Sequence, residues 1–221
     1  MLNPIEEKKY QDLKNKCMEL RVPPPPDLFI GLQVHDEKGV LVFDDVQRGH
    51  SWVRNFWNNM TYWMQGQSFS DGLTGAGHLC LKQTSGSWCI SSAGGVPWSV
   101  GTLGSVTGIV VGTSDTAFSV EQYALQAVIA HGTGAGQFSY AAQSAWANAY
   151  TAGAKTWKST GTRIFNNNSG GSITVKETGI YMNNSMVVMA ERSVLSPTVT
   201  VATGGQLTVT YEISMDFSAI D

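Results

Sequence analysis

The sequence predicts a mainly β protein: an antiparallel β-sandwich with a helical N-terminal arm and one or two short helices. Short runs of β-branched and aromatic residues alternate with Gly-, Asn- and Ser-rich turns, which is typical of sandwiches. A polar, helix-forming segment comes first, and four consecutive prolines end it. The 221 residues also suffice for a buried core, because folding at this length removes roughly 70% of the chain's surface from water.

The chain carries little charge for a globular protein. Asp, Glu, Lys and Arg make up 14% of the residues, against about 25% on average, and the formal net charge is -3. A sparsely charged surface favours a protein covered by neighbours over a freely diffusing enzyme. The 14 Lys and Arg residues provide no basic footprint, so we expect no nucleic-acid partner.

The sequence predicts neither insertion into a membrane nor a disulfide framework. No run of about 18 apolar residues occurs, and Met1–Leu20 is rich in Glu and Lys, so we expect no transmembrane helix and no signal peptide. The 3 cysteines are odd in number, which fits no set of paired disulfides. A reducing site of synthesis is the simplest interpretation.

Residues 4–20 predict a helix. Pro4 suits the first helical position, and Glu6 and Glu7 favour the positive end of the helix dipole. Four side chains in this segment follow the a/d spacing of a short heptad pattern. They are Tyr10, Leu13, Cys17 and Leu20. We expect this seam to be covered, either by the chain's own domain or by another copy of the chain.

The prolines divide the chain into an arm and a body. Pro23–Pro26 favours polyproline II, which is a stiff spacer. We therefore expect a helical arm at 1–22, a polyproline linker at 23–27 and a sandwich domain at 28–221, with a long irregular insertion at about 65–105. The alternative is a rigid surface linker within one compact domain.

Two elements are expected at the start of the body. Residues 28–34 and 40–43 predict a hairpin about an Asp36–Gly39 turn. Residues 51–64 predict a helix capped by Ser51, because aromatic and Met residues recur there at helical spacing. Such an aromatic face indicates a core or a subunit interface. Five tryptophans are candidates for an interface or for stacking on a ligand: Trp52, Trp57, Trp63, Trp88 and Trp98.

The C-terminal half predicts further strands and one short helix. A buried strand is expected at residues 108–112, which are mostly apolar. A second strand is expected at residues 173–180, where residues facing the two sides of a sheet alternate. Ser119–Gln122 has the form of a capping box, which predicts a short helix continuing to Ile129. Residues 198–211 predict a β-hairpin, because β-branched residues alternate on both sides of a Gly-Gly turn.

Segments that resemble catalytic motifs each lack a required residue. Gly49–Ser51 resembles the start of a nucleophile elbow, but Val53 stands where that turn requires Gly. Gly132–Gly136 resembles a phosphate-binding loop, yet no acidic partner follows it, and Gln137 stands in place of a Walker-type Lys. We interpret Ser51 as a helix cap and the glycines as turn geometry.

Metal binding and hydrolysis are also disfavoured. His78, Cys80 and Cys89 provide three ligands, whereas a structural zinc site needs four. Acidic residues are sparse in the body of the chain, which argues against the paired carboxylates of a polysaccharide hydrolase. We therefore expect no catalytic residue, no cofactor, no bound metal and no enzymatic activity.

Several short blocks follow one another in a distinctive order. They are His50–Asn55, Gly108–Gly112, Tyr123–Leu125, Ile129–Gln137 with Tyr140, Arg163–Gly170, Ile173–Tyr181, Glu191–Leu195 and Gly205–Tyr211. Each block alone is ordinary β-protein sequence. Their order, over roughly residues 48–217, resembles that of virion structural proteins of tailed bacteriophages, of the neck, tail or baseplate type. The helical arm and the four prolines lie outside the resemblance.

The resemblance implies a structural component of a tailed bacteriophage particle that acts by homo-oligomeric assembly and by attachment to other virion proteins. Such a protein is synthesised in the host cytoplasm and resides in the virion. One alternative is a receptor- or carbohydrate-binding tail-fibre or spike module, with Trp88 and Trp98 stacking on the sugar rings of a host-surface glycan. A second alternative is a capsid decoration or head-fibre protein.

Overall fold

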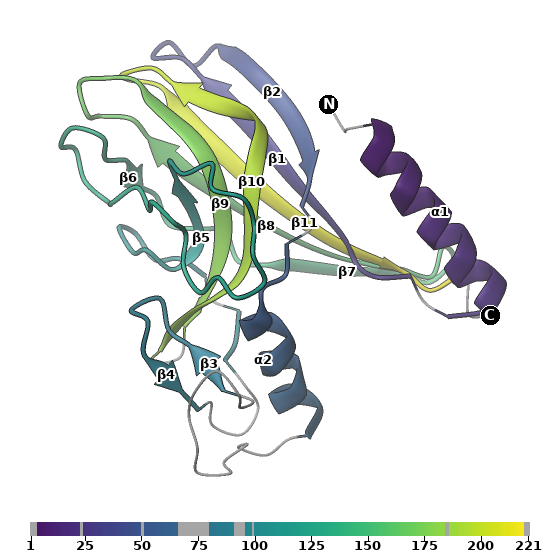
Figure 1. Ribbon diagram of the computed structural model, residues 1–221. Helices are drawn as coiled ribbons and strands as arrows, with labels where there is room; N and C mark the ends of the chain where they lie inside the picture. Colours follow the sequence, from purple (N-terminus) through teal and green to yellow (C-terminus); the bar gives the residue numbers. More distant parts are fainter. Residues whose placement is uncertain are drawn as a thin grey trace.

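Two antiparallel β-sheets face each other in the computed structural model, which confirms the predicted β-sandwich class (Figure 1). The structure describes residues 4–22, 24–49, 51–65, 80–90, 96–98, 100–183 and 186–218. The strands are β1 (Asp27–His35), β2 (Leu41–Arg48), β3 (Leu81–Lys82), β4 (Trp88–Cys89), β5 (Gly108–Gly112), β6 (Ser139–Tyr140), β7 (Ala147–Thr151), β8 (Thr156–Asn166), β9 (Ile173–Asn183), β10 (Val187–Val201) and β11 (Gln206–Asp216).

The larger sheet has the strand order β2-β1-β11-β8-β6, with β7 also paired to β8. The smaller sheet has the order β10-β9-β5, and β3 and β4 form a separate hairpin. That hairpin falls within the insertion expected at about 65–105, of which the structure describes 80–90, 96–98 and 100–105.

The helices of the described chain are α1 (Pro4–Leu20) and α2 (Arg54–Gln65). α1 has the predicted bounds. α2 begins after the predicted start at residue 51, because the chain there still runs alongside β10: Trp52 forms a β-bridge with Glu191, and the Val53 amide donates to the Ala190 carbonyl over 3.1 Å. Neither helix, within the described part of the chain, has the length and apolar character needed to cross a membrane.

The first predicted hairpin is confirmed. β1 pairs with β2 in antiparallel register, and the turn between them is closed by the Asp36 side chain, whose Oδ1 accepts hydrogen bonds from the Lys38 and Val40 amides, each 2.9 Å long. Gly39 follows with a φ of 78°, a left-handed conformation that glycine adopts without strain. β2 is therefore an edge strand of the larger sheet.

The hairpin predicted over residues 198–211 is wrong, because its two strands belong to different sheets. Residues 199–201 of β10 pair with β9, whereas β11 lies between β1 and β8. Both edges of β11 are already occupied, so β10 has no edge of it to pair with. The Gly204–Gly205 turn carries the chain across the sandwich, and the strictly alternating residues on its two sides face each other through the core.

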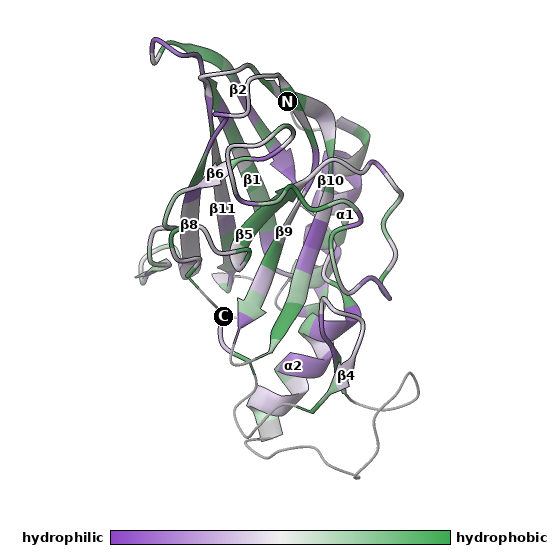
Figure 2. Ribbon diagram, turned by 90° about the vertical axis from the view of Figure 1, so that its left-hand side faces the viewer, coloured by the Kyte–Doolittle hydropathy of each residue, from purple (hydrophilic) through white to green (hydrophobic). Residues whose placement is uncertain are grey.

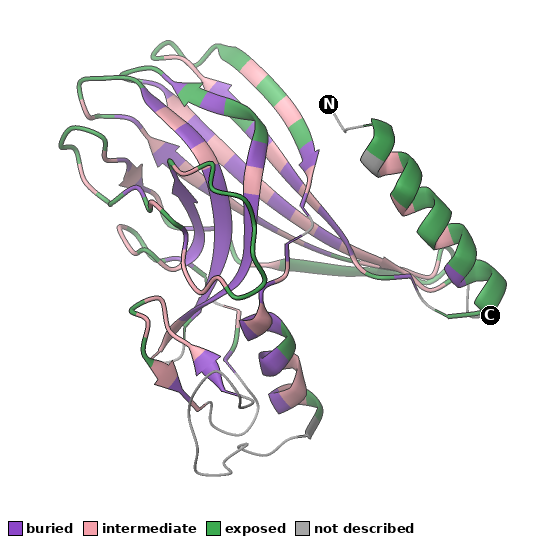
Figure 3. Ribbon diagram, viewed as in Figure 1, coloured by how far each residue is buried: buried purple, intermediate pink, exposed green. Residues whose placement is uncertain are grey.

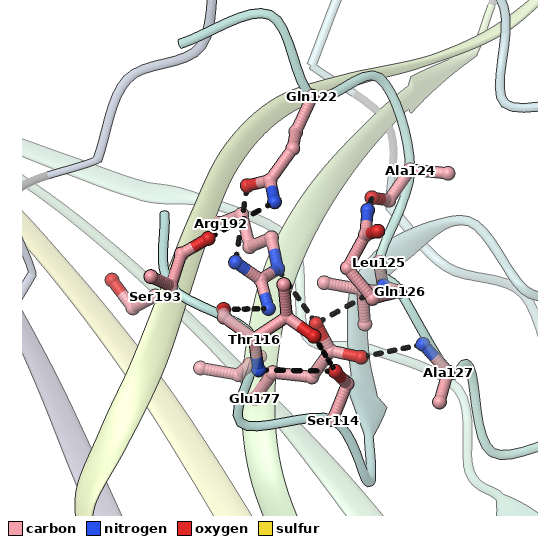
Figure 4. Close-up of polar contacts among 12 residues, drawn as sticks. Ser114, Thr116, Gln122, Ala124, Leu125, Gln126, Ala127, Glu177, Arg192 and Ser193 are labelled. Carbon is pink, nitrogen blue, oxygen red and sulfur yellow. Dashed lines mark hydrogen bonds and ion pairs between the residues drawn. The ribbon is translucent and has the colours of Figure 1, made fainter. Parts of the chain in front are cut away.

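The short helix predicted from Ser119 to Ile129 is also wrong. Residues 119–122 do form a single turn, in which the Gln122 amide donates to the Ser119 carbonyl over 3.0 Å. The chain cannot continue as a helix because its next amides have other acceptors. The Glu177 carboxylate accepts from the amides of Gln126 and Ala127, at 3.1 and 2.8 Å (Figure 4).

The main core fills the space between the two sheets. Leu207, Val209 and Tyr211 of β11 are fully buried there, and all five residues of β5 are buried opposite them. Figure 2 shows β5 as a hydrophobic strand inside the sandwich. A second apolar cluster joins α2 to the β3–β4 hairpin and to the neighbouring ends of β9 and β10, and its members include Phe56 and Leu81.

Asparagine side chains fasten α2 to this second cluster. Asn55 both donates to and accepts from the backbone of Lys82, each at 2.8 Å, and Asn59 does the same with Val96, at 2.8 and 2.6 Å. These side-chain amides imitate the backbone pairing of a neighbouring strand. They fix the rotation of α2 about its axis and so decide which side chains it presents to the sandwich.

Candidate functional site: a tryptophan-lined pocket

A pocket of about 640 Å³ lies between α2 and the strands β7, β8 and β11. Six tryptophans line it: Trp52, Trp57, Trp63, Trp98, Trp146 and Trp157. The remaining lining is mostly apolar, with Asn148 and Ser159 as its polar side chains. Small-molecule and peptide pockets are commonly 300–1,000 Å³ and mainly apolar, so the size and lining are those of a binding site.

The α2 side of the pocket is a packed aromatic cluster. The Trp52 and Phe56 rings stack with centroids 4.1 Å apart, and Trp98 meets the edge of Trp52 at 6.0 Å. Trp57 packs edge-on against Phe56 at 5.1 Å, yet 52% of its surface is exposed. Trp57 is therefore held in place on one side and free to contact a ligand on the other.

The sheet side of the pocket depends on one glycine. A Cβ on Gly161 of β8 would lie 2.9 Å from the Trp146 ring, so the absent side chain makes room for that ring. Trp146 in turn meets Trp98 at 5.6 Å and thereby joins the two sides of the pocket. We expect Gly161→Ala to displace Trp146, because a contact that short requires something to move.

The structure brings together four of the five tryptophans predicted as interface or ligand residues. Trp52, Trp57, Trp63 and Trp98 line the pocket, whereas Trp88 lies on β4, where Arg54 and Lys82 each approach its ring at 5.3 Å. Trp88 is therefore not part of the pocket that Trp98 lines, and stacking of either ring on a sugar stays a prediction.

Sequence reasoning missed Trp146 and Trp157. Trp157 begins the inward positions of β8, which continue at 159, 161, 163 and 165, but these positions hold Ser, Gly and Arg as well as Phe, so the sequence shows no apolar alternation there. Gly161 among these positions marks a close approach by another group. The identity of the group, Trp146, depends on tertiary packing and has no local signal.

The described lining of the pocket holds no charged side chain. Among the described residues that line it there is no Asp, Glu, His, Lys, Arg or Cys. Elsewhere in the described residues, no group of three or more His, Cys, Asp and Glu side chains is placed to hold a metal ion. His50 of the elbow-like motif and His78 of the considered metal set lie outside the described residues.

The arm lies beside the sandwich and is exposed along most of its length (Figure 3). Its main contact is Arg48, at the end of β2, whose guanidinium donates to both carboxylate oxygens of Glu7, at 3.0 and 2.9 Å. The same guanidinium bonds to Asp27 and lies 4.0 Å from the centroid of the Tyr10 ring. A second ion pair joins Lys14 to Asp27 over 2.8 Å.

The predicted heptad seam is only half covered. Tyr10 faces the sandwich and its hydroxyl donates to the Pro25 carbonyl over 2.9 Å, and Cys17 is buried. Leu13 and Leu20 are 46% and 62% exposed. The helix therefore docks on its own chain by a charged face and leaves Leu13 and Leu20, on an apolar face, exposed.

The ion pairs of the arm make its docking sensitive to acid. Burial alone would raise the pKa of the Asp27 carboxyl, but hydrogen bonds from Lys14 and Arg48 outweigh it and lower that pKa below its usual value. A lowered pKa in the folded state means that Asp27 stabilises the docked arm above pH ~4. This contribution is lost as the pH falls through the lowered pKa, so acid should release the arm.

We expect Arg48→Met to detach the arm without unfolding the sandwich. The substitution leaves Glu7 and Asp27 without their shared cation, at a cost of about 2 kcal/mol. Hydrogen exchange of the α1 amides should become about 30-fold faster, while amides of β8 and β11 keep their protection.

Lys16→Met is the matched control for this measurement. Lys16 pairs over 2.6 Å with Glu19 on the same helix, and both side chains are 64% exposed. Its removal should change arm exchange by less than about twofold. Unchanged α1 exchange in Arg48→Met would contradict the assigned docking contact.

Comparisons of the chain with protein-family models, with curated proteins and with solved structures give no match. The fold and the site themselves define the chain as an antiparallel β-sandwich with a large apolar pocket and a helical arm.

Proposed function

We propose that the chain is a structural component of a tailed bacteriophage particle, at the neck, tail or baseplate, and that it acts by binding further copies of itself and other virion proteins. The ordered sequence blocks that resemble phage structural proteins support this proposal, as does the sparse charge of the body. A capsid decoration or head-fibre protein would use the same surfaces, and only its position in the particle would differ.

The observation that carries the proposal is the tryptophan pocket. An apolar cavity of this size, whose described lining residues include no acid, base or cation, is suited to holding an apolar segment of another molecule, because burial of apolar surface is its main source of binding energy. Trp is also the residue type most enriched among side chains that dominate interface energetics.

A second copy of this chain is the occupant that the structure favours. Pro26, in the linker that follows the arm, forms part of the pocket wall, so the arm joins the body of the chain beside the pocket. The arm also exposes Leu13 and Leu20, whose apolar surface a neighbouring copy would cover. A contact between the arm of one copy and the pocket of the next is heterologous, and such contacts close into rings or extend into filaments.

The test is the mass of the purified full chain in solution, measured by light scattering over a range of concentrations. We expect an oligomer of the 23.8 kDa chain. Trp57→Glu should weaken its association at least ~30-fold, as expected for an exposed Trp at the centre of an interface. Val42→Glu is the control, because Val42 is 60% exposed on β2, away from the pocket strands. A wild-type monomer, or equal association of Trp57→Glu and wild type, would contradict the proposal.

A further inference from the structure

A second pocket, of about 410 Å³, lies between the turn after β3 and the loop formed by residues 119–126. Unlike the tryptophan pocket, it is lined mainly by polar side chains. They include Thr84, Ser119, Glu121, Gln122, Tyr123 and Gln126. None of the residues that line the tryptophan pocket lines this one, so the two pockets are separate sites.

The loop that forms this pocket is irregular but firmly held from below (Figure 4). Beneath it lies a buried ion pair in which Arg192 Nε donates to Glu177 over 2.6 Å, with both side chains fully buried. Arg192 also donates to the Gln122 side chain over 3.0 Å, and Glu177 accepts from two loop amides. The Tyr181 hydroxyl accepts from the Leu125 amide over 2.8 Å.

This support is costly, because two charges are removed from water to hold a loop in a non-helical shape. A loop that only covered the sheet could have completed the helical turn that begins at Ser119. The network instead fixes the positions of the pocket's side chains before any ligand arrives, which is how binding sites reduce the entropy cost of association.

Several hydrogen-bonding atoms of the pocket have no partner among the described residues. They are the hydroxyls of Thr84 and Tyr123, the Oε1 atom of Gln126 and the second carboxylate oxygen of Glu121, whose first oxygen is 3.1 Å from Arg54. The set contains both donors and acceptors, and the Tyr123 ring adds an apolar surface.

The charges around the pocket narrow the class of ligand. Among the described residues no Lys or Arg lines it, and the nearest cations already have partners: Arg54 pairs with Glu121, and Lys82 Nζ lies 3.9 Å from the centroid of the Tyr123 ring. The lining itself offers mixed hydrogen-bonding groups beside an aromatic ring, which match a neutral polyhydroxylated molecule.

We propose that this pocket binds a neutral saccharide through Thr84, Glu121, Tyr123 and Gln126. The hydroxyls of the sugar exchange hydrogen bonds with these side chains, and its C–H groups contact the Tyr123 ring. The proposal goes beyond assembly: it gives the chain a second, glycan-binding surface, at a different place from the Trp88 and Trp98 pair considered from the sequence.

The test is binding of the full chain to an array of neutral and acidic oligosaccharides, followed by NMR saturation transfer with the neutral sugar that binds best. Tyr123→Ala and Gln126→Ala should each weaken binding at least about tenfold, since each removes a contact that the sugar makes. Thr84→Val tests the same site with a variant of nearly unchanged shape, and we expect a loss of similar size.

Trp98→Ala is the control, because Trp98 lines the tryptophan pocket and not this one. The proposal is overturned if no neutral glycan binds, if Tyr123→Ala and Gln126→Ala bind as wild type does, or if Trp98→Ala abolishes binding. Because Trp57→Glu should lower the oligomer mass without affecting sugar binding, failure of this proposal is distinguishable from failure of the assembly proposal.

Discussion

Arg163→Met is expected to destabilise the protein by on the order of 5 kcal/mol. Arg163 is fully buried, and no acidic side chain among the described residues is bonded to it. Its guanidinium instead donates to five backbone carbonyls, at 2.6 to 2.9 Å. They belong to Thr102, Ser105, Thr107, Ile109 and Ala141. Burial lowers the pKa of Arg163 to about 10, which leaves it charged at neutral pH.

The expected loss of stability is large because Met would leave the backbone carbonyls around Arg163 without a hydrogen-bond donor. Carbonyls that lose a donor inside the protein carry a desolvation penalty of about 1–3 kcal/mol each, although such penalties are not additive. For a chain of this length, the loss corresponds to a fall in the midpoint of thermal unfolding of roughly 10–20 °C.

Two further variants serve as comparisons for the stability of Arg163→Met. Arg163→Lys keeps the charge but lacks the planar fork, so it should lose most of the same stability. Lys158→Met removes an exposed ion pair with Glu212 and should change stability by less than about 1 kcal/mol. Urea denaturation gives the free energies, and a loss below about 1 kcal/mol for Arg163→Met would contradict the assigned role.

The second large effect concerns Glu191, which makes stability depend on pH. Glu191 of β10 is fully buried, and burial raises its pKa to about 8 despite its hydrogen bonds with Ser193 and Tyr211. The carboxyl group is therefore protonated at neutral pH in the folded protein.

A protonated Glu191 completes a hydrogen-bond chain between the two sheets. Its proton can be donated to the Tyr211 hydroxyl, 2.6 Å away, which then donates to the Thr178 hydroxyl over 3.3 Å. Thr178 donates in turn to the Val110 carbonyl over 3.0 Å. Each hydroxyl in this chain has one donor and one acceptor, so the neutral carboxyl satisfies every group.

The sign of the effect follows from the raised pKa. Between pH ~4.5 and ~8 the folded state holds a proton on Glu191 that the unfolded state has lost, so the folding equilibrium constant should fall by up to about tenfold per pH unit as the pH rises. Glu191→Gln, which can make the same hydrogen bonds without titrating, should remove this dependence and be the more stable form above pH ~8.

Urea denaturation of both proteins from pH 5 to pH 9 measures this difference. Tyr211 does not titrate in this range, because burial raises the pKa of its hydroxyl well above the usual value. Parallel stability curves for wild type and Glu191→Gln over this range would show that the Glu191 carboxyl is already ionised at neutral pH, and would contradict its raised pKa.

The parts of the fold that the sequence predicted are those with local signals. The Pro4 start of α1 and the Asp36–Gly39 turn act through neighbouring residues, and both appear where expected. The wrong predictions concern segments whose structure depends on residues far away in the sequence. The strands on either side of Gly204–Gly205 have the sequence pattern of a hairpin. They do not pair with each other, because β1 and β8 already occupy both edges of β11. The helix after Ser119 is prevented by Glu177, more than fifty residues away in sequence.

The candidate site also has a part that the sequence predicted and a part that it did not. The aromatic face of α2 was visible as helical spacing, and it supplies Trp57 and Trp63 to the tryptophan pocket. Trp146 joins that pocket only because Gly161 leaves space above β8. The polar pocket formed by Thr84 and residues 119–126 had no sequence signal, because the side chains of its loop converge only once Arg192 and Glu177 hold the loop in an irregular shape.

The most direct test of the proposed assembly is an electron cryomicroscopy map of the particle that contains this chain. We predict that a neighbouring copy fills the tryptophan pocket between α2 and β8, with side chains of its arm against Trp57. A particle in which that pocket faces solvent, or a chain absent from every particle, would contradict the assembly proposal.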